Sequence, residues 1–139
     1  MAAQSPPTEQ FGMARRTSSL PLDVERDVLD LVVRVGEALI GTGSPVAETT
    51  VELMRLAAGF GVTNLHIDIT FISITATIDR HDDPLTKVRV IDARTADYSR
   101  LTDLHRMIDD VATGKLTLID AQSKFDQIVT GPHPYRRWM

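Results

Sequence analysis

The sequence of 139 residues contains no cysteine, and aromatic residues make up only 5% of it. The absence of cysteine excludes disulfide bonds, a thiol nucleophile and zinc–thiolate sites. No apolar run reaches the roughly 18 residues that a membrane-spanning helix needs. Met1 is not followed by a basic start, an apolar stretch and a cleavage site, so no signal peptide is indicated. We therefore expect a soluble, cytosolic chain.

An excess of basic residues is also lacking, because the net charge is −4 and the pI is about 5.5. This balance argues against nucleic acid as a partner, since a protein that neutralises phosphates needs a basic face. The chain has no glycine-rich phosphate loop, dinucleotide fingerprint, HExxH or GxSxG motif. Its four histidines are scattered without ligand spacing. The sequence thus predicts no cofactor and no metal site.

The overall composition is typical of a single globular domain, with 42% hydrophobic and 24% charged residues. A chain of this size can bury a core without covalent staples. Residues 1–21 are rich in Ser, Thr, Gln and Pro, and we expect them to form a disordered N-terminal tail. The folded domain is expected to span residues 22–131.

The most informative stretch is 64–79 (NLHIDITFISITATID), the one long run dominated by β-branched residues. Apolar and polar residues alternate up to Phe71, which predicts a strand with one buried face. After Phe71 the alternation shifts by one residue, a shift that would turn later side chains to the wrong face of a continuous strand. The chain must therefore bulge or reverse near Thr70–Ser73, and we expect a reversal that gives two antiparallel strands.

Helical spacing of apolar residues predicts four helices around these strands. The first runs from Leu22 or Asp23 to Ile40, with Asp23 as its cap. The second begins with Ser44 as cap and Pro45 as its first residue and ends near Phe60. The third covers about 97–113 with Tyr98 facing inward, and the fourth opens at Thr117 and ends before Gly131. A further strand at 86–92 is expected to turn Val88 and Val90 inward and Lys87 and Arg89 outward.

This order, α-α-β-β-β-α-α, predicts an α+β fold in which the helices pack on a three-stranded, mainly antiparallel sheet. The apolar faces of four amphipathic helices are more than a sheet of three strands easily covers. We therefore expect that an exposed helix or an edge strand contacts a second copy or another domain.

Two polar rows on the predicted strands, His66/Asp68/Thr70 and Ser73/Thr75/Thr77, are the first candidates for a functional surface. Glu48 and Glu52 stand one turn apart on the second helix, where paired carboxylates can act as acid and base or bind a metal. A solvated helix face explains this pair more simply. His105 and Asp109, one turn apart on the third helix, are interpreted as a surface pair, since two ligands alone make a poor metal site.

Several segments, in the same order and spacing, resemble one known family. They are 36–39 (GEAL), 43–48 (GSPVAE), 66–75 (HIDITFISIT), 83–86 (DPLT), 88–90 (VRV), 94–101 (RTADYSRL) and 134–138 (PYRRW). Together they are similar to the N-terminal region of the threonine/serine exporter family in its actinobacterial form. The resemblance covers about residues 28–139.

The resemblance implies a cytosolic N-terminal domain that precedes a bundle of about ten membrane helices and serves threonine and serine export across the inner membrane. Residues 132–139 would then be a junction that leads into the first membrane helix. Arg136, Arg137 and Trp138 suit the cytoplasmic side of such a helix. The expected partners are the membrane domain of the same transporter, threonine or serine, and a second copy in a homodimer. The domain would act through regulation, sensing or assembly and not through translocation itself.

Two alternatives remain open at this stage. The family's N-terminal region has been likened to hydrolases, and a hydrolase-like domain would use His66, Asp68 and Ser73 as its catalytic residues. The other alternative is a stand-alone dimerisation module. The residues expected to bind a ligand or to form the functional surface are His66, Asp68, Thr70, Ser73, Thr75 and Glu48.

Overall fold

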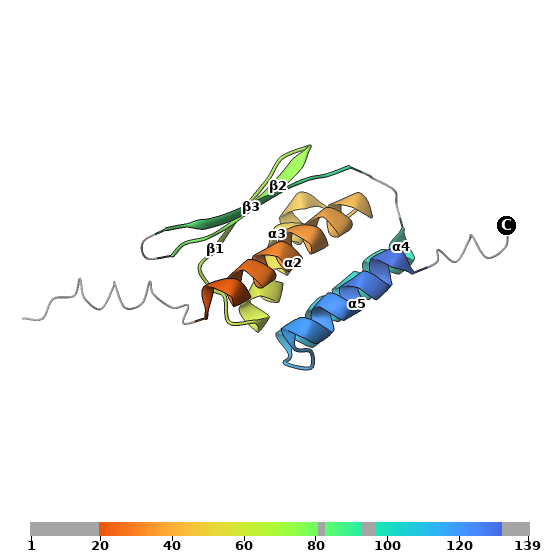
Figure 1. The fold of residues 1–139 in the computed structure, drawn as a ribbon. Helices are drawn as coiled ribbons and strands as arrows, with labels where there is room; N and C mark the ends of the chain where they lie inside the picture. The colour runs from red at the N-terminus through yellow and green to blue at the C-terminus, as the bar shows by residue number, and fades with distance from the viewer. Residues whose placement is uncertain (1–19, 81–82, 93–96, 132–139) are drawn as a thin grey trace, which may run out of the picture.

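A computed structural model of the chain describes residues 20–80, 83–92 and 97–131. The predicted tail up to residue 19 and the predicted junction 132–139 lie outside these ranges. The elements, shown in Figure 1, are α2 (Leu22–Gly41), α3 (Val46–Gly59), β1 (Leu65–Ile69), β2 (Ser73–Ile78), β3 (Leu85–Val90), α4 (Tyr98–Ala112) and α5 (Leu118–Thr130). Their order confirms the predicted α-α-β-β-β-α-α arrangement and the α+β class.

The described elements form three layers (Figure 1). The sheet covers one side of the α2–α3 pair, and α4 and α5 lie on the opposite side of that pair. Helix α2 runs beneath β2 and β3, whereas α3 lies beneath β1 and also contacts α4. Because α2 has neighbours on both sides, it supplies much of the core, including the fully buried Val28, Leu29, Leu31, Val32, Val35 and Leu39.

Gly36 lets α2 approach its neighbours closely. A Cβ atom at this position would lie 2.8 Å from Cδ1 of Ile74 in β2 and 2.9 Å from Cδ1 of Leu53 in α3. Both distances are shorter than carbon–carbon van der Waals contact. The missing side chain therefore brings α2, α3 and the sheet together at a single point.

The reversal predicted from the shift in alternation is present. Strands β1 and β2 pair antiparallel with Ile69 opposite Ile74, and the Thr70 amide donates to the Ser73 carbonyl at 2.9 Å. The Thr70 hydroxyl accepts from the amides of Ser73 at 3.0 Å and Ile72 at 3.3 Å. This side chain supplies the turn chemistry that no Gly, Pro or Asn provides. The shift keeps the apolar residues of both strands on the helix side, where Ile74, Ala76 and Ile78 are fully buried.

Strand β3 is oriented opposite to the sequence prediction. Val88 and Val90 are 61% and 58% exposed on the outer face, so the expectation that they face inward is wrong. The register places Lys87 opposite Ala76 and Arg89 opposite the buried Ile74, hence on the helix side. Arg89 forms an ion pair there with Glu37 of α2. The position of β3 at the edge allows this, because a long basic side chain can reach past the helix to water.

Other local expectations also need correction. The N-caps of α2 and α3 are Pro21 and Pro45, and neither Asp23 nor Ser44 caps by a side-chain hydrogen bond. Proline suits these positions because its extended backbone precedes the helix and its missing N–H would have no intrahelical partner. Tyr98, predicted to face inward, is 75% exposed. Val46 and Met54 of α3 are also exposed, whereas Leu56 is buried.

Candidate functional site

The outer face of the sheet carries most of the residues that the sequence singled out. The register places His66 opposite Thr77 and Asp68 opposite Thr75, and these four residues share one face. The described helices lie against the other face (Figure 1). His66 and Asp68 are exposed and Thr75 is half-buried. The structure thus brings His66, Asp68 and Thr75 into one open polar surface.

The remaining predicted residues lie elsewhere or have structural partners. Thr70 and Ser73 face each other across the β-turn, with their hydroxyl oxygens 3.1 Å apart. Ser73 is four positions along β2 from Thr77, the partner of His66, which is roughly 13 Å along the strand. Glu48 is exposed on α3, on the opposite side of the sheet. His66, Asp68 and Ser73 therefore do not assemble into a nucleophile, a base and an orienting group.

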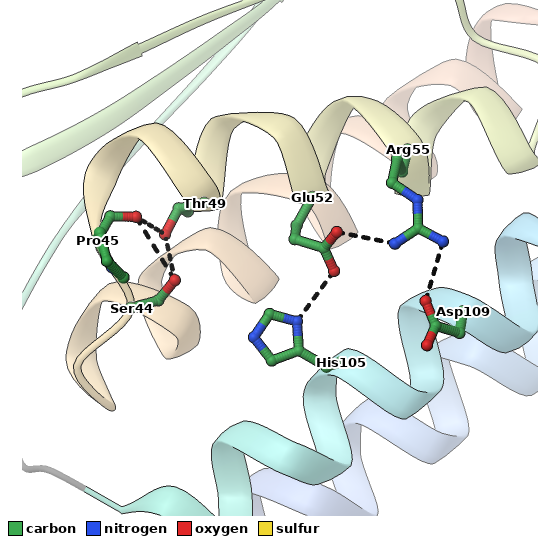
Figure 2. A network of polar contacts seen from close by, with 7 residues as sticks. All are labelled: Ser44, Pro45, Thr49, Glu52, Arg55, His105 and Asp109. Atoms are coloured by element: carbon green, nitrogen blue, oxygen red, sulfur yellow. Dashed lines mark hydrogen bonds and ion pairs between the residues drawn. The ribbon is translucent and has the colours of Figure 1, made fainter.

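A second polar site, between α3 and α4, was not predicted as a unit (Figure 2). Glu52 of α3 is 9% exposed and is contacted through both carboxylate oxygens. Its Oε1 accepts from Nη1 of Arg55 at 2.8 Å, and its Oε2 lies 3.0 Å from Nδ1 of His105 in α4. A carboxylate with so little exposure requires such donors, because an unpaired buried charge is costly.

The contacts continue from Glu52 to the next turn of α4. Nη2 of Arg55 donates to Oδ1 of Asp109 at 2.9 Å, so the guanidinium bridges two carboxylates on two helices. The hydrogen bonds to Glu52 and then to Asp109 raise the pKa of Arg55 above its ordinary value. Arg55 consequently stays protonated, and its charge does not change across the pH range of normal handling. We call Glu52, Arg55, His105 and Asp109 the interhelix network.

A buried hydroxyl pair lies on the same side of α3, one turn before Glu52 (Figure 2). Thr49 is fully buried and donates through Oγ1 to the Pro45 carbonyl at 2.8 Å, and this oxygen lies 3.0 Å from Oγ of Ser44. These contacts give both buried hydroxyl groups a partner, but neither oxygen accepts from an amide of the first turn. Ser44, predicted as a cap, instead contacts Thr49 and the Pro45 carbonyl.

Chemically, the interhelix network joins two helices. Glu52 orients the His105 imidazole through Nδ1, as an acid–base dyad would. The nearby hydroxyls of Ser44 and Thr49, however, are bonded to each other and to Pro45. Across the described ranges, no group of three or more His, Cys, Asp or Glu side chains is arranged to hold a metal ion. The arrangement fits a clamp between α3 and α4.

Sequence reasoning had noticed each half of this network separately. Glu52 was assigned with Glu48 to a solvated face, which is wrong for Glu52, and His105 and Asp109 were interpreted as a surface pair. Asp109 is indeed exposed, but His105 contacts Glu52 across the helix interface. The available signal was the matching spacing: Glu52 precedes Arg55 by three residues, and His105 precedes Asp109 by four. Such spacing predicts a pair within each helix, whereas the contact between the two helices depends on how α4 packs against α3.

The fold and the two polar sites define a layered α+β domain with an open sheet face and an ionic clamp between its helix layers. Residues 30–139 match the family described as "Putative threonine/serine exporter". This match covers most of the chain, including all or part of every described helix and strand. The chain belongs to the threonine/serine exporter family.

Two curated relatives agree with this assignment. A "Probable threonine/serine exporter" from Mycobacterium tuberculosis is 33% identical over 138 residues, which cover 96% of this chain and 26% of that protein. A "Threonine/serine exporter" from Corynebacterium glutamicum is 23% identical over 111 residues, which cover 78% of this chain and 23% of that protein. The chain thus spans about a quarter of the length of these relatives. No solved structure matches it significantly.

Among the helices of the described ranges, none is both long enough and apolar enough to cross a bilayer.

Proposed function

We propose that this chain forms the cytoplasmic N-terminal domain of a threonine/serine exporter and serves amino-acid efflux through regulation, sensing or assembly. The observation that carries the proposal is the family match over residues 30–139, which includes all of the buried hydrophobic core except Val28 and Leu29. Translocation would be performed by a membrane domain of the same transporter. This chain covers only about a quarter of the length of the curated relatives, which leaves room for such a domain.

The arrangement of the described layers supports a regulatory or assembly role. The interhelix network connects α3, which lies beneath the sheet, to α4 in the outer helix layer. Arg34 of α2 connects in the same way to Asp126 of α5 at 3.2 Å and lies over the Phe125 ring at 5.1 Å. Such contacts join the helices beneath the sheet to the outer helix layer, which is the connection that a regulatory or assembly role would require.

A chimeric exporter tests this function. In the Mycobacterium tuberculosis relative, the segment that matches this chain is either deleted or replaced by this chain, and labelled threonine efflux is followed in an exporter-deficient host. We expect the deletion to lower or deregulate efflux and the replacement to restore it. If the deletion leaves the rate and the regulation of efflux unchanged, the proposal is overturned.

Calorimetry separates the sensing version from the assembly version. The purified chain is titrated with threonine and serine up to millimolar concentration, with alanine as the control amino acid. Sensing predicts saturable heat for threonine and serine but not for alanine. If threonine and serine produce neither heat nor chemical-shift changes, the sensing version is removed and assembly is the role that stands.

A further inference from the structure

Strand β1 is an open edge of the sheet. The strand order is β1-β2-β3, and in the described ranges no segment pairs with the outer side of β1. The Asn64 carbonyl accepts from the Asp79 amide at 3.0 Å, and the Thr70 amide donates to the Ser73 carbonyl at 2.9 Å. In an antiparallel ladder, the even-numbered residues of β1 therefore bond to β2. The backbone groups of Leu65, Ile67 and Ile69 point to the open edge.

Apart from Asp68, this edge lacks the usual protection against pairing with another strand. Natural edge strands commonly carry proline, lysine or a bulge, and β1 (LHIDI) has no proline, no lysine and an unbroken register with β2. Its three outward backbone amides and carbonyls form a regular row. Such a row is a template for a further antiparallel strand.

Below the open edge of β1, helix α3 carries a stripe of exposed apolar side chains. Ala47, Val51, Met54 and Ala58 are all exposed and recur at the spacing of one helix face. Val51 is 58% exposed. The stripe lies opposite the buried face of α3, where Leu53 and Ala57 pack in the core. The packed sides of α3 contact α2, α4 and β1. The stripe therefore lies on the remaining side of the helix, away from α2 and below the β1 edge.

We propose that two copies of this chain pair through their β1 edges, antiparallel about a two-fold axis at Ile67, with the two α3 stripes packed beneath. In this register, His66 of one copy stands opposite Asp68 of the partner subunit, and the symmetry repeats the pair. Leu65 stands opposite Ile69 of the partner subunit on the apolar side. The sheet becomes a continuous six-stranded sheet, and both edge surfaces are used at once.

Charge complementarity selects this register from the symmetric alternatives. The backbone groups at the open edge belong to odd-numbered residues, so an odd-numbered residue of one copy must bond to an odd-numbered residue of the other. Two-fold axes at His66, Ile67 and Asp68 meet this requirement. An axis at Asp68 would set two carboxylates against each other, and an axis at His66 would set two imidazoles against each other. The axis at Ile67 instead makes two His–Asp pairs and uses all five strand residues.

The α3 stripe is a necessary part of this interface. Stable dimer interfaces bury about 1,200–2,000 Å² in total, and a five-residue strand edge alone falls short of that area. The apolar side chains beneath the edge add the missing surface. The proposed dimer rests on the assembly role proposed above. Its oligomeric state is measured without any transport assay, so a failure of the dimer can be distinguished from a failure of the export role.

A charge swap tests the His–Asp pairs. The full chain, His66→Asp, and the double variant His66→Asp/Asp68→His are compared by sedimentation equilibrium, with circular dichroism to check folding. We expect a wild-type dimer, a dissociation constant at least about tenfold weaker for His66→Asp, and recovery to within about threefold in the double variant. A folded wild-type chain that stays monomeric up to about 1 mM, or a single variant that dimerises unchanged, overturns the proposal.

Cysteine crosslinking tests the register, because the natural chain has no cysteine. His66→Cys and Asp68→Cys chains are prepared separately, mixed and mildly oxidised. Facing residues of a non-hydrogen-bonded pair have Cα atoms about 4.5 Å apart, within disulfide range. We expect a covalent dimer in the mixture and little in either chain alone. Efficient crosslinking of one variant with itself would contradict the axis at Ile67.

A third comparison tests the helix stripe. Val51→Glu places a charge in the proposed interface, whereas Val88→Glu places one on the outer sheet face at a similarly exposed valine. We expect Val51→Glu to weaken dimerisation at least about tenfold and Val88→Glu to leave it within about threefold. Equal effects of the two variants, with both chains folded, would contradict a role for α3.

Discussion

Two glutamates one turn apart on α3 have different environments. Glu48 is exposed to solvent, whereas Glu52 lies between two helices with both oxygens contacted by Arg55 and His105. The residue type does not distinguish them, and in the local sequence only Glu52 has a basic residue, Arg55, one turn further on. The difference arises because α4 packs against one side of α3 only.

Replacing Glu52 by Gln removes the charge and keeps the size of the side chain. We expect Glu52→Gln to lower the free energy of unfolding by about 1–3 kcal/mol, because the donors of Arg55 and His105 lose a buried charged acceptor. Glu48→Gln, the matched control, should change it by less than about 0.5 kcal/mol. Urea denaturation of both variants provides the measurement, and equal effects would show that the interhelix network does not stabilise the fold.

The helix crossings depend on glycines at the scale of whole elements. A Cβ atom on Gly59 of α3 would lie 2.8 Å from the carbonyl oxygen of Val111 and 2.6 Å from its Cγ1. A backbone atom cannot move without shifting α4. The Cβ contacts of Gly36 are different, since they involve only the terminal methyl groups of Ile74 and Leu53.

This difference predicts unequal costs for two otherwise similar substitutions. Gly59→Ala should lower the free energy of unfolding by about 1–3 kcal/mol, because overpacking against α4 exceeds the gain of alanine in helix propensity. Gly36→Ala should cost less, since flexible side-chain ends can rotate away. Thermal unfolding of the two variants tests the order, and a larger loss for Gly36→Ala would contradict it.

The β1–β2 turn depends on one hydroxyl group. Thr70→Ala removes the oxygen that accepts from the amides of Ile72 and Ser73, and we expect a loss of about 1 kcal/mol in unfolding free energy. Thr70→Ser keeps this oxygen and should retain most of the stability. Urea denaturation of the pair decides the point, since similar losses for both would assign the effect to the methyl group.

At the scale of the whole molecule, the sheet is covered by described helices on one face and is open along β1. The proposed dimer predicts a concentration-dependent pattern of amide hydrogen exchange. The amide of Ile67 should exchange fast in dilute protein and slowly in concentrated protein, whereas the amides of His66 and Asp68, bonded to β2, should stay protected throughout. An Ile67 amide with the same exchange rate at both concentrations would contradict pairing at this edge.

Some features follow from the sequence because their causes are local. The shift in alternation at Phe71 requires a bulge or a reversal whatever surrounds it, since a regular continuous strand would bury polar residues. The helices at 22–41, 46–59, 98–112 and 118–130 follow from apolar spacing and from stop signals such as Gly61 and Gly114, both of which have positive φ. Family membership was likewise anticipated from short segments in a shared order.

The sequence by itself therefore determined the element order, the hairpin, the shared face of His66 and Asp68, and the family. Only the tertiary structure decided that Glu52 is buried, that Arg89 and not Val88 faces the helices, and that His105 meets a residue 53 positions earlier. The physical reason is the sequence distance over which each cause acts. Periodicity places a side chain on one face of its own element, but its partner depends on how distant elements pack against that face.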